Sequence, residues 1–75
     1  MLTQLLKIMR LAGYLTYESG LFLWTVKGAL EVKDYAGQNP EDWAKEYMKR
    51  SIELFGEIYF AQLLKQMEAP TNAKI

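Results

Sequence analysis

The fold of this chain is decided by residues 39–67, which read NPEDWAKEYMKRSIELFGEIYFAQLLKQM. Asn39 is a favoured N-cap, because its side-chain oxygen can accept a hydrogen bond from a free backbone N–H, and Pro40 suits the first helical position. Two acidic residues follow in the first turn, where the positive end of the helix dipole favours them. The next proline lies beyond the segment. These features predict one continuous amphipathic helix over 40–67.

The predicted helix carries an apolar face that is wider than a single surface helix needs. Placed at about 100° per residue, its apolar side chains span roughly 180°, whereas a surface helix needs a stripe of roughly 100°. Beyond Glu57 the polar side also becomes apolar, at Phe60, Leu63 and Leu64. Leaving such surface in water costs about 25 cal/mol per Å². We therefore expect another chain to cover part of it.

Length and composition indicate that oligomerisation completes the core. A chain of 75 residues forms one domain at most, and small domains often need a disulfide, a metal or an oligomer. The chain has no cysteine and no histidine, although 51% of its residues are hydrophobic. Disulfides and the usual transition-metal sites are therefore not expected. We expect a homo-oligomer, most simply a dimer, in a reducing compartment such as the cytoplasm.

The charge balance argues against nucleic acid as a partner. Nine basic and nine acidic side chains give a formal net charge of zero, whereas nucleic-acid-binding domains usually carry a basic excess or patch. The densest basic cluster is Lys45, Lys49 and Arg50, and glutamates interleave with it. We interpret this cluster as a solvated, salt-bridged helix face.

Residues 14–33 allow more than one interpretation. The runs 14–17 and 21–26 are rich in β-forming residues, and the three residues between them could turn, which would make a strand hairpin. Neither run alternates polar with apolar residues, however, as a half-buried strand should. On a helical wheel most of the apolar residues of 14–33 form one broad arc, with Leu23 and Leu30 as the main exceptions. We therefore favour a helix over 14–33 and keep the hairpin as the alternative.

A change of helical phase predicts a break near Gly13. The apolar stripe before this glycine lies nearly opposite the stripe after it, so a straight helix would bury different sides in its two parts. Glycine here suits a helix C-terminus or a hinge. The prediction is a single helical domain over 1–67, with helices at about 3–12, 14–33 and 40–67, the last two packed antiparallel, and a flexible tail over 68–75.

Residues 11–32 also suggest a membrane-associated protein, which we do not favour. Glu18 is the one charged residue between Leu11 and Val26. A membrane span needs about twenty apolar residues, and an acid at its centre costs roughly 2.5–3.5 kcal/mol. A membrane-associated helical protein that uses this segment stays an alternative.

Glu18 is also the residue that breaks the apolar pattern of the predicted second helix. In that helix it lies at the centre of the apolar arc, where a carboxylate needs a partner or becomes protonated. It could reach water at a hinge, bond a tyrosine hydroxyl, or fix register as a buried polar group in an oligomer core. We mark Glu18 as a candidate buried specificity residue. A carrier or sensor that holds a small apolar ligand beside it is a further alternative.

The sequence as a whole predicts an all-α protein: an antiparallel helical hairpin with a short N-terminal helix, assembled as a homo-oligomeric helical bundle. It contains no catalytic, metal, cofactor or nucleotide-binding motif. We therefore predict a small non-enzymatic protein–protein interaction module (adaptor, regulator or assembly factor) that binds itself and another protein. The predicted contact surface, in which Phe60 and Leu64 carry the most weight, is Phe22, Trp24, Trp43, Tyr47, Phe55, Tyr59, Phe60 and Leu64.

Overall fold

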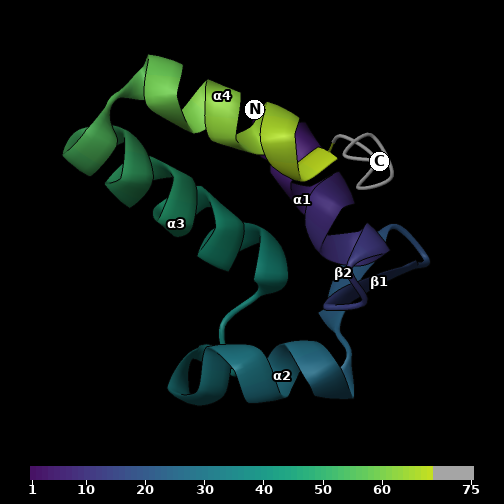
Figure 1. The fold of residues 1–75 in the computed structure, drawn as a ribbon. Helices are drawn as coiled ribbons and strands as arrows, with labels where there is room; N and C mark the ends of the chain where they lie inside the picture. Colours follow the sequence, from purple (N-terminus) through teal and green to yellow (C-terminus); the bar gives the residue numbers. More distant parts are fainter. Residues whose placement is uncertain (69–75) are drawn as a thin grey trace.

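Four helices, a two-stranded hairpin and a 3-10 turn make up residues 1–68, the part of the chain that the computed structural model describes. In chain order they are α1 (Leu2–Leu11), β1 (Leu15–Glu18), β2 (Leu21–Trp24), α2 (Val26–Val32), η1 (Lys33–Tyr35), α3 (Pro40–Phe55) and α4 (Glu57–Glu68). Helices α3 and α4 form the arms of a V, and α1 packs against both arms (Figure 1). The chain is mostly helical, as predicted, and it carries in addition a small two-stranded sheet that an all-α fold does not include.

Helix α1 ends at Leu11, two residues before Gly13, close to the break that the change of phase predicts. Gly13 has a φ of +89°, a conformation that favours glycine, and the next N–H, of Tyr14, donates to the carbonyl of Met9 at 2.9 Å. Lys27 Nζ donates to the carbonyl of Ala12 at 2.9 Å. A cation is favourable at this negative end of the helix dipole. The end of α1 is therefore set by local backbone chemistry and by one lysine from α2.

Residues 14–33 form a strand hairpin followed by a short helix, which corrects the prediction of a continuous helix. The antiparallel register pairs Leu15 with Trp24, Thr16 with Leu23, Tyr17 with Phe22 and Glu18 with Leu21. Ser19 and Gly20 connect the strands with φ angles of +52° and +80°. Two successive positive φ angles characterise the type I′ turn, whose twist matches that of the paired strands.

The hairpin lacks an alternating pattern because apolar side chains occupy both of its faces. Leu15 is buried in the core, whereas Leu21 and Leu23 are exposed. A strand whose solvent-facing positions are apolar loses the period-two signal that identifies it in the sequence. The helical wheel places Leu15 and Leu21 in a single arc, although they lie on opposite sides of the sheet.

Helix α2 is held closely against the hairpin. The side chain of Thr25 caps the helix by accepting the N–H of Gly28 at 3.0 Å. A Cβ at Gly28 would lie 2.1 Å from the carbonyl oxygen of Tyr14, so only glycine allows this approach. On the other side, Trp24 Nε1 donates to the carbonyl of Gln38 at 2.8 Å. The hairpin is thereby tied to the loop that leads into α3.

Helices α3 and α4 are separate, and this corrects the prediction of one helix over 40–67. Asn39 caps α3 as expected, since its Oδ1 accepts the N–H of Glu41 at 2.8 Å. At Gly56 the backbone takes φ +97° and ψ 153°, which no α-helix contains. The chain bends at this glycine, and α4 folds back toward α1 (Figure 1).

The core lies where α1 meets α3, α4 and β1. Its buried residues are Leu5, Leu6, Ile8, Met9, Leu15, Ala44, Phe60 and Leu64. No polar or charged side chain is buried within residues 1–68. The predicted antiparallel pair of 14–33 and 40–67 is replaced by the V of α3 and α4. Of the predicted flexible tail, Glu68 is the last residue of α4, and 69–75 lie outside the described residues.

Candidate functional site

The structure distributes the predicted contact residues among four places. Phe60 and Leu64 have 0% exposed surface, which corrects their assignment to a contact surface. The bend at Gly56 changes the direction in which α4 presents its side chains, so both residues face inward. The remaining six are Phe22 in the hairpin, Trp24, Trp43 and Tyr47 in an aromatic row, and Phe55 and Tyr59 at the bend between α3 and α4.

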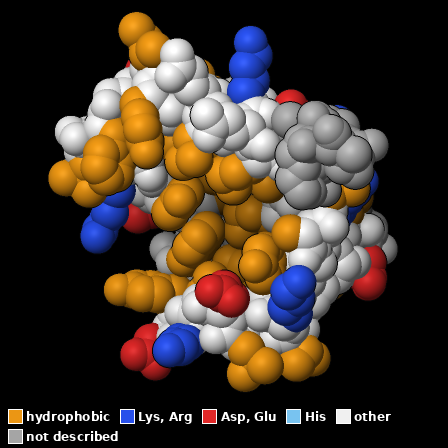
Figure 2. Space-filling model, viewed as in Figure 1, with side chains coloured by type: hydrophobic (Ala, Val, Ile, Leu, Met, Phe, Trp, Pro, Cys, Tyr) orange, Lys and Arg blue, Asp and Glu red, His pale blue; other side chains and the backbone are white. Residues whose placement is uncertain are grey.

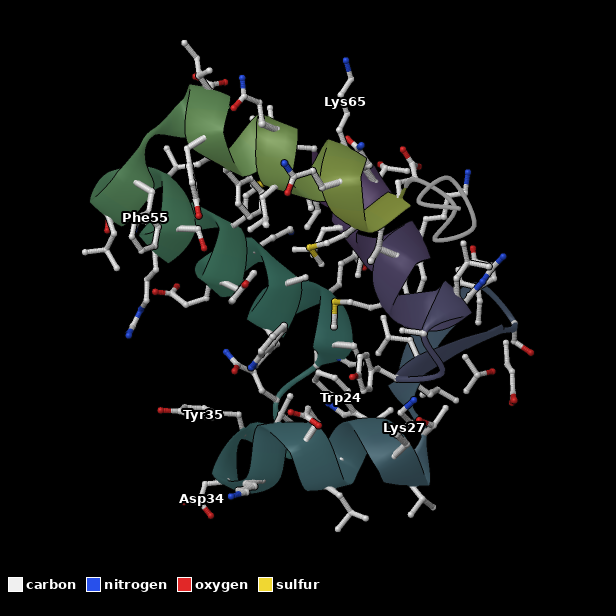
Figure 3. All side chains as sticks on the ribbon, viewed as in Figure 1. Trp24, Lys27, Asp34, Tyr35, Phe55 and Lys65 are labelled. Carbon is white, nitrogen blue, oxygen red and sulfur yellow. The ribbon has the colours of Figure 1, made fainter. Side chains whose placement is uncertain are left out.

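The bend between α3 and α4 presents an apolar surface that we call the elbow patch. It consists of Leu54, Phe55, Ile58 and Tyr59, which are between 52% and 76% exposed. The rings of Phe55 and Tyr59 lie 5.3 Å apart, centroid to centroid, and contact each other across the bend. Figure 3 shows Phe55 at this outer corner of the V, well away from α2. The elbow patch therefore faces solvent at one end of the molecule.

A row of aromatic rings runs from the hairpin to the core. Trp24 meets Trp43 edge to face, with ring centroids 5.7 Å apart. Trp43 stacks on Tyr47 at 5.2 Å with an interplanar angle of 8°, and Tyr47 meets the buried Phe60 at 6.3 Å. Both arrangements are favoured by the aromatic quadrupole. The row fixes the orientation of Trp43 and Tyr47 at the surface of α3.

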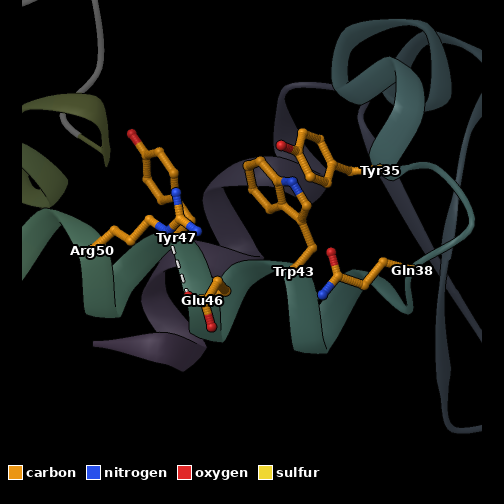
Figure 4. A pocket seen from close by; sticks show the side chains of 6 residues that line it. All are labelled: Tyr35, Gln38, Trp43, Glu46, Tyr47 and Arg50. Atoms are coloured by element: carbon orange, nitrogen blue, oxygen red, sulfur yellow. Dashed lines mark hydrogen bonds and ion pairs between the residues drawn. The ribbon is translucent and has the colours of Figure 1, made fainter.

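Trp43 and Tyr47 also form one side of a surface cleft of about 520 Å³, which we call the aromatic cleft. The other residues that line it are Tyr35, Gln38, Glu46 and Arg50. Tyr35 extends from η1 toward the indole of Trp43, so rings from two elements face the cleft (Figure 4). Arg50 Nε lies 3.4 Å from Glu46 Oε2 along one side of α3. The cleft thus combines aromatic faces with a carboxylate.

A second cavity, of about 220 Å³, adjoins the aromatic cleft. It lies among α1, the hairpin, α2, α3 and α4, and it shares Trp43 and Tyr47 with the cleft. Glu31 is the one charged residue in its described lining, which also contains the adaptable side chains of Met9 and Met67. Figure 2 shows hydrophobic side chains gathered in the hollow between the arms of the V and α2.

Glu18 lies at the end of β1 beside the hairpin turn and is exposed. The hydroxyl of Thr16 donates to Glu18 Oε2 at 3.2 Å, and the described linings of the two cavities do not include Glu18. This corrects its predicted burial in a helical apolar arc of the subunit, whereas its role in partner specificity stays a prediction. Because Glu18 stands at the end of β1 next to the turn, it reaches water although its sequence neighbours are hydrophobic.

Four residues that line the aromatic cleft were not among the contact residues predicted from the sequence. Trp43, Tyr47 and Arg50 are spaced i, i+4 and i+7, and Glu46–Arg50 is an i,i+4 pair, so one side of the cleft could have been found on the helical wheel. Tyr35 and Gln38 lie before α3, and the fold of that segment brings them to the cleft. No helical spacing in the sequence predicts this position. Sequence patterns therefore identify residues on one helix but not their partners from another element.

Comparison with protein-family models, curated proteins and solved structures found no match for this chain. Among residues 1–68, no group of three or more potential side-chain ligands is placed to hold a metal ion. The helices of this part of the chain are too short or too polar to span a lipid bilayer.

Proposed function

We propose that this protein is a small non-enzymatic interaction module that binds a second copy of itself through the elbow patch. The observation that carries the proposal is the exposure of four apolar residues within one turn of Gly56, namely Leu54, Phe55, Ile58 and Tyr59, of which Phe55 and Tyr59 are in ring contact. Exposed apolar residues that occur singly are normal on a protein surface, whereas a contiguous group of this kind is typical of an interaction site.

The size of the elbow patch suits a dimer of small subunits. Four side chains of this size, more than half exposed, present on the order of 500 Å² of apolar surface. A stable interface buries about 800 Å² per partner, including a polar rim around an apolar centre. The patch therefore supplies the centre of a standard interface, and neighbouring polar residues of α3 and α4 supply the rim.

A second copy is the partner that the position of the patch favours. The patch lies at a convex corner, where two identical surfaces can meet about a twofold axis without either chain having to open. Aromatic and aliphatic residues from the ends of both helices would then interdigitate. The resulting contact would extend the α3–α4 pair into a four-helix arrangement.

The proposal is tested by placing charges in the elbow patch. Leu54→Glu with Ile58→Glu replaces two residues that are 73% and 76% exposed, so it leaves the core of the subunit intact. The matched control is Val26→Glu with Leu30→Glu, which replaces two equally exposed residues of α2. Light scattering on a sizing column should give twice the chain mass of 8.7 kDa for the wild type and the control, and a single chain mass for the elbow variant.

Two outcomes would contradict the proposal. The wild type could elute as one chain at concentrations of several hundred micromolar, on the scale at which weak dimers form. Alternatively, the elbow variant could remain dimeric while the α2 control becomes monomeric, which would move the interface to α2. Circular dichroism of each variant establishes that the helices are retained.

A further inference from the structure

The aromatic cleft has a chemistry that is separate from that of the elbow patch. The faces of aromatic rings attract cations, and arginine makes such contacts more often than lysine. A guanidinium group can lie flat against a ring and bond a carboxylate at the same time. The cleft offers both features, since Tyr35 and Trp43 face it from two elements and Glu46 lies beside them (Figure 4).

Arg50 shows within the molecule that the cleft accommodates a guanidinium group. Its Nε contacts Glu46 Oε2 at 3.4 Å, and it lines the same cleft as Tyr47. The contact is long, and the two side chains are 73% and 53% exposed. Ion pairs of this kind contribute little to stability and exchange readily with solvent. A second guanidinium group can therefore compete with Arg50 for Glu46 at little cost to the fold.

The size and charge of the cavities favour an arginine that belongs to a partner protein. A volume of about 520 Å³ falls within the range of ligand sites and exceeds what one guanidinium group fills, so the flanking residues of a peptide also fit. In the described lining of the cleft the charges of Glu46 and Arg50 balance, and the adjoining cavity adds the carboxylate of Glu31, so removing Arg50 from its pair leaves an acidic surface. A basic segment is the complementary partner.

We infer that the aromatic cleft binds an arginine side chain from a basic segment of a partner protein. The guanidinium group lies between the rings of Tyr35 and Trp43 and bonds the carboxylate of Glu46. The inference rests on the proposed role of this protein as an interaction module and identifies the chemistry of its second partner. It does not require the elbow patch, because the two surfaces share no residue.

The test is a titration of the full-length protein with N-acetyl-Gly-Arg-Gly-amide, followed by the indole N–H signals of Trp43 and Trp24 in two-dimensional NMR at low ionic strength. The signal of Trp43 should shift more than that of Trp24, whose N–H is held by the carbonyl of Gln38. For a single side chain we expect a dissociation constant on the order of 1 mM. The same peptide with citrulline, a neutral isostere of arginine, should bind at least about fivefold more weakly.

Four variants locate the site. Tyr35→Ala should weaken binding of the arginine peptide at least about fivefold, and Tyr35→Phe should retain it, because the ring face is kept. Tyr35 is 63% exposed, so neither change disturbs the core. Glu46→Gln should weaken binding about threefold to tenfold by removing the charge, and Arg50→Gln should strengthen it about twofold by removing the competitor.

Equal binding of the citrulline and arginine peptides would overturn the inference, since the cleft would then recognise only shape. Equal binding of a lysine peptide would overturn the assignment of a guanidinium group, and an unchanged affinity of Tyr35→Ala would place the site elsewhere. The same titration on Leu54→Glu with Ile58→Glu separates the two proposals. Retained peptide binding by a monomeric variant supports the inference even if dimerisation is what fails.

Discussion

Phe60 and Leu64 are the side chains on which the stability of the subunit depends most. Both have 0% exposed surface, so shortening either one leaves a cavity. Leu64→Ala should lower the free energy of unfolding by about 2–5 kcal/mol. Phe60→Ala should lower the free energy of unfolding by about 3–5 kcal/mol, which is a large part of the total stability of a domain of this size. Because that variant would unfold too easily to measure, Phe60→Leu, which should lose about 1 kcal/mol, is the better choice.

Urea denaturation measures these differences, and Val26→Ala is the control. Val26 is 79% exposed, so its truncation should change the free energy of unfolding by less than about 0.5 kcal/mol. If Leu64→Ala lost no more than the Val26 control, Leu64 would not be part of the core.

The same two residues show what a sequence pattern can determine about a single side chain. The pattern identified Phe60 and Leu64 as apolar residues in an unusual position, but it assigned them to the wrong environment. Their direction was calculated for a continuous helix from residue 40, and the bend at Gly56 resets the phase of α4. Glu18 was misplaced for a related reason, because its burial was calculated for a helix and it lies in a strand. Burial depends on the element type, which must be known first.

At the scale of the elements, Gly56 decides that α3 and α4 are two helices. With φ +97° and ψ 153° it occupies a region that is open almost only to glycine. Nothing lies within 4 Å of a Cβ built at this position. Gly56→Ala therefore introduces backbone strain without a clash and should lower the free energy of unfolding by about 1–3 kcal/mol.

Gly37→Ala is the matched control for this prediction. It has equally open space around its Cβ and no positive φ, so its effect should stay within about 0.5 kcal/mol in the same urea titration. A gain in helicity and stability on Gly56→Ala would mean that the chain prefers one continuous helix over 40–67. The V-shaped fold would then be incorrect.

How well an element could be predicted depended on how local its determinants are. The cap at Asn39 and the turn of the chain at Gly13 after α1 depend mainly on residues within one turn, and the structure has both close to where the sequence indicates. The hairpin turn is less clearly indicated by the sequence, because Ser19 has a positive φ and serine is not among the residues that typically mark such a position. In the aromatic cleft, Trp43 and Tyr47 share a helix and were assigned together, whereas Tyr35 reaches them only through the folded path of the loop.

At the scale of the molecule, chain length and apolar content together predict how much apolar surface stays uncovered. A chain of 75 residues with 51% hydrophobic composition was expected to leave helical apolar surface uncovered. The structure has such surface, but at the elbow patch and in the hollow of the V (Figure 2) instead of at Phe60 and Leu64. Composition predicts that apolar surface is left over, while its position depends on where the helices bend.

If the elbow patch joins two copies, the thermal stability of the protein must depend on its concentration. Unfolding then releases two chains from each dimer, so mass action raises Tm by roughly 5 °C for each tenfold increase in protein concentration. Leu54→Glu with Ile58→Glu should remove this dependence, because a monomer unfolds without changing the number of particles, whereas Val26→Glu with Leu30→Glu should retain it. Scanning calorimetry from about 10 µM to 1 mM covers the range in which weak dimers form. A wild-type Tm that stays constant over this range would show that the elbow patch does not couple self-association to folding.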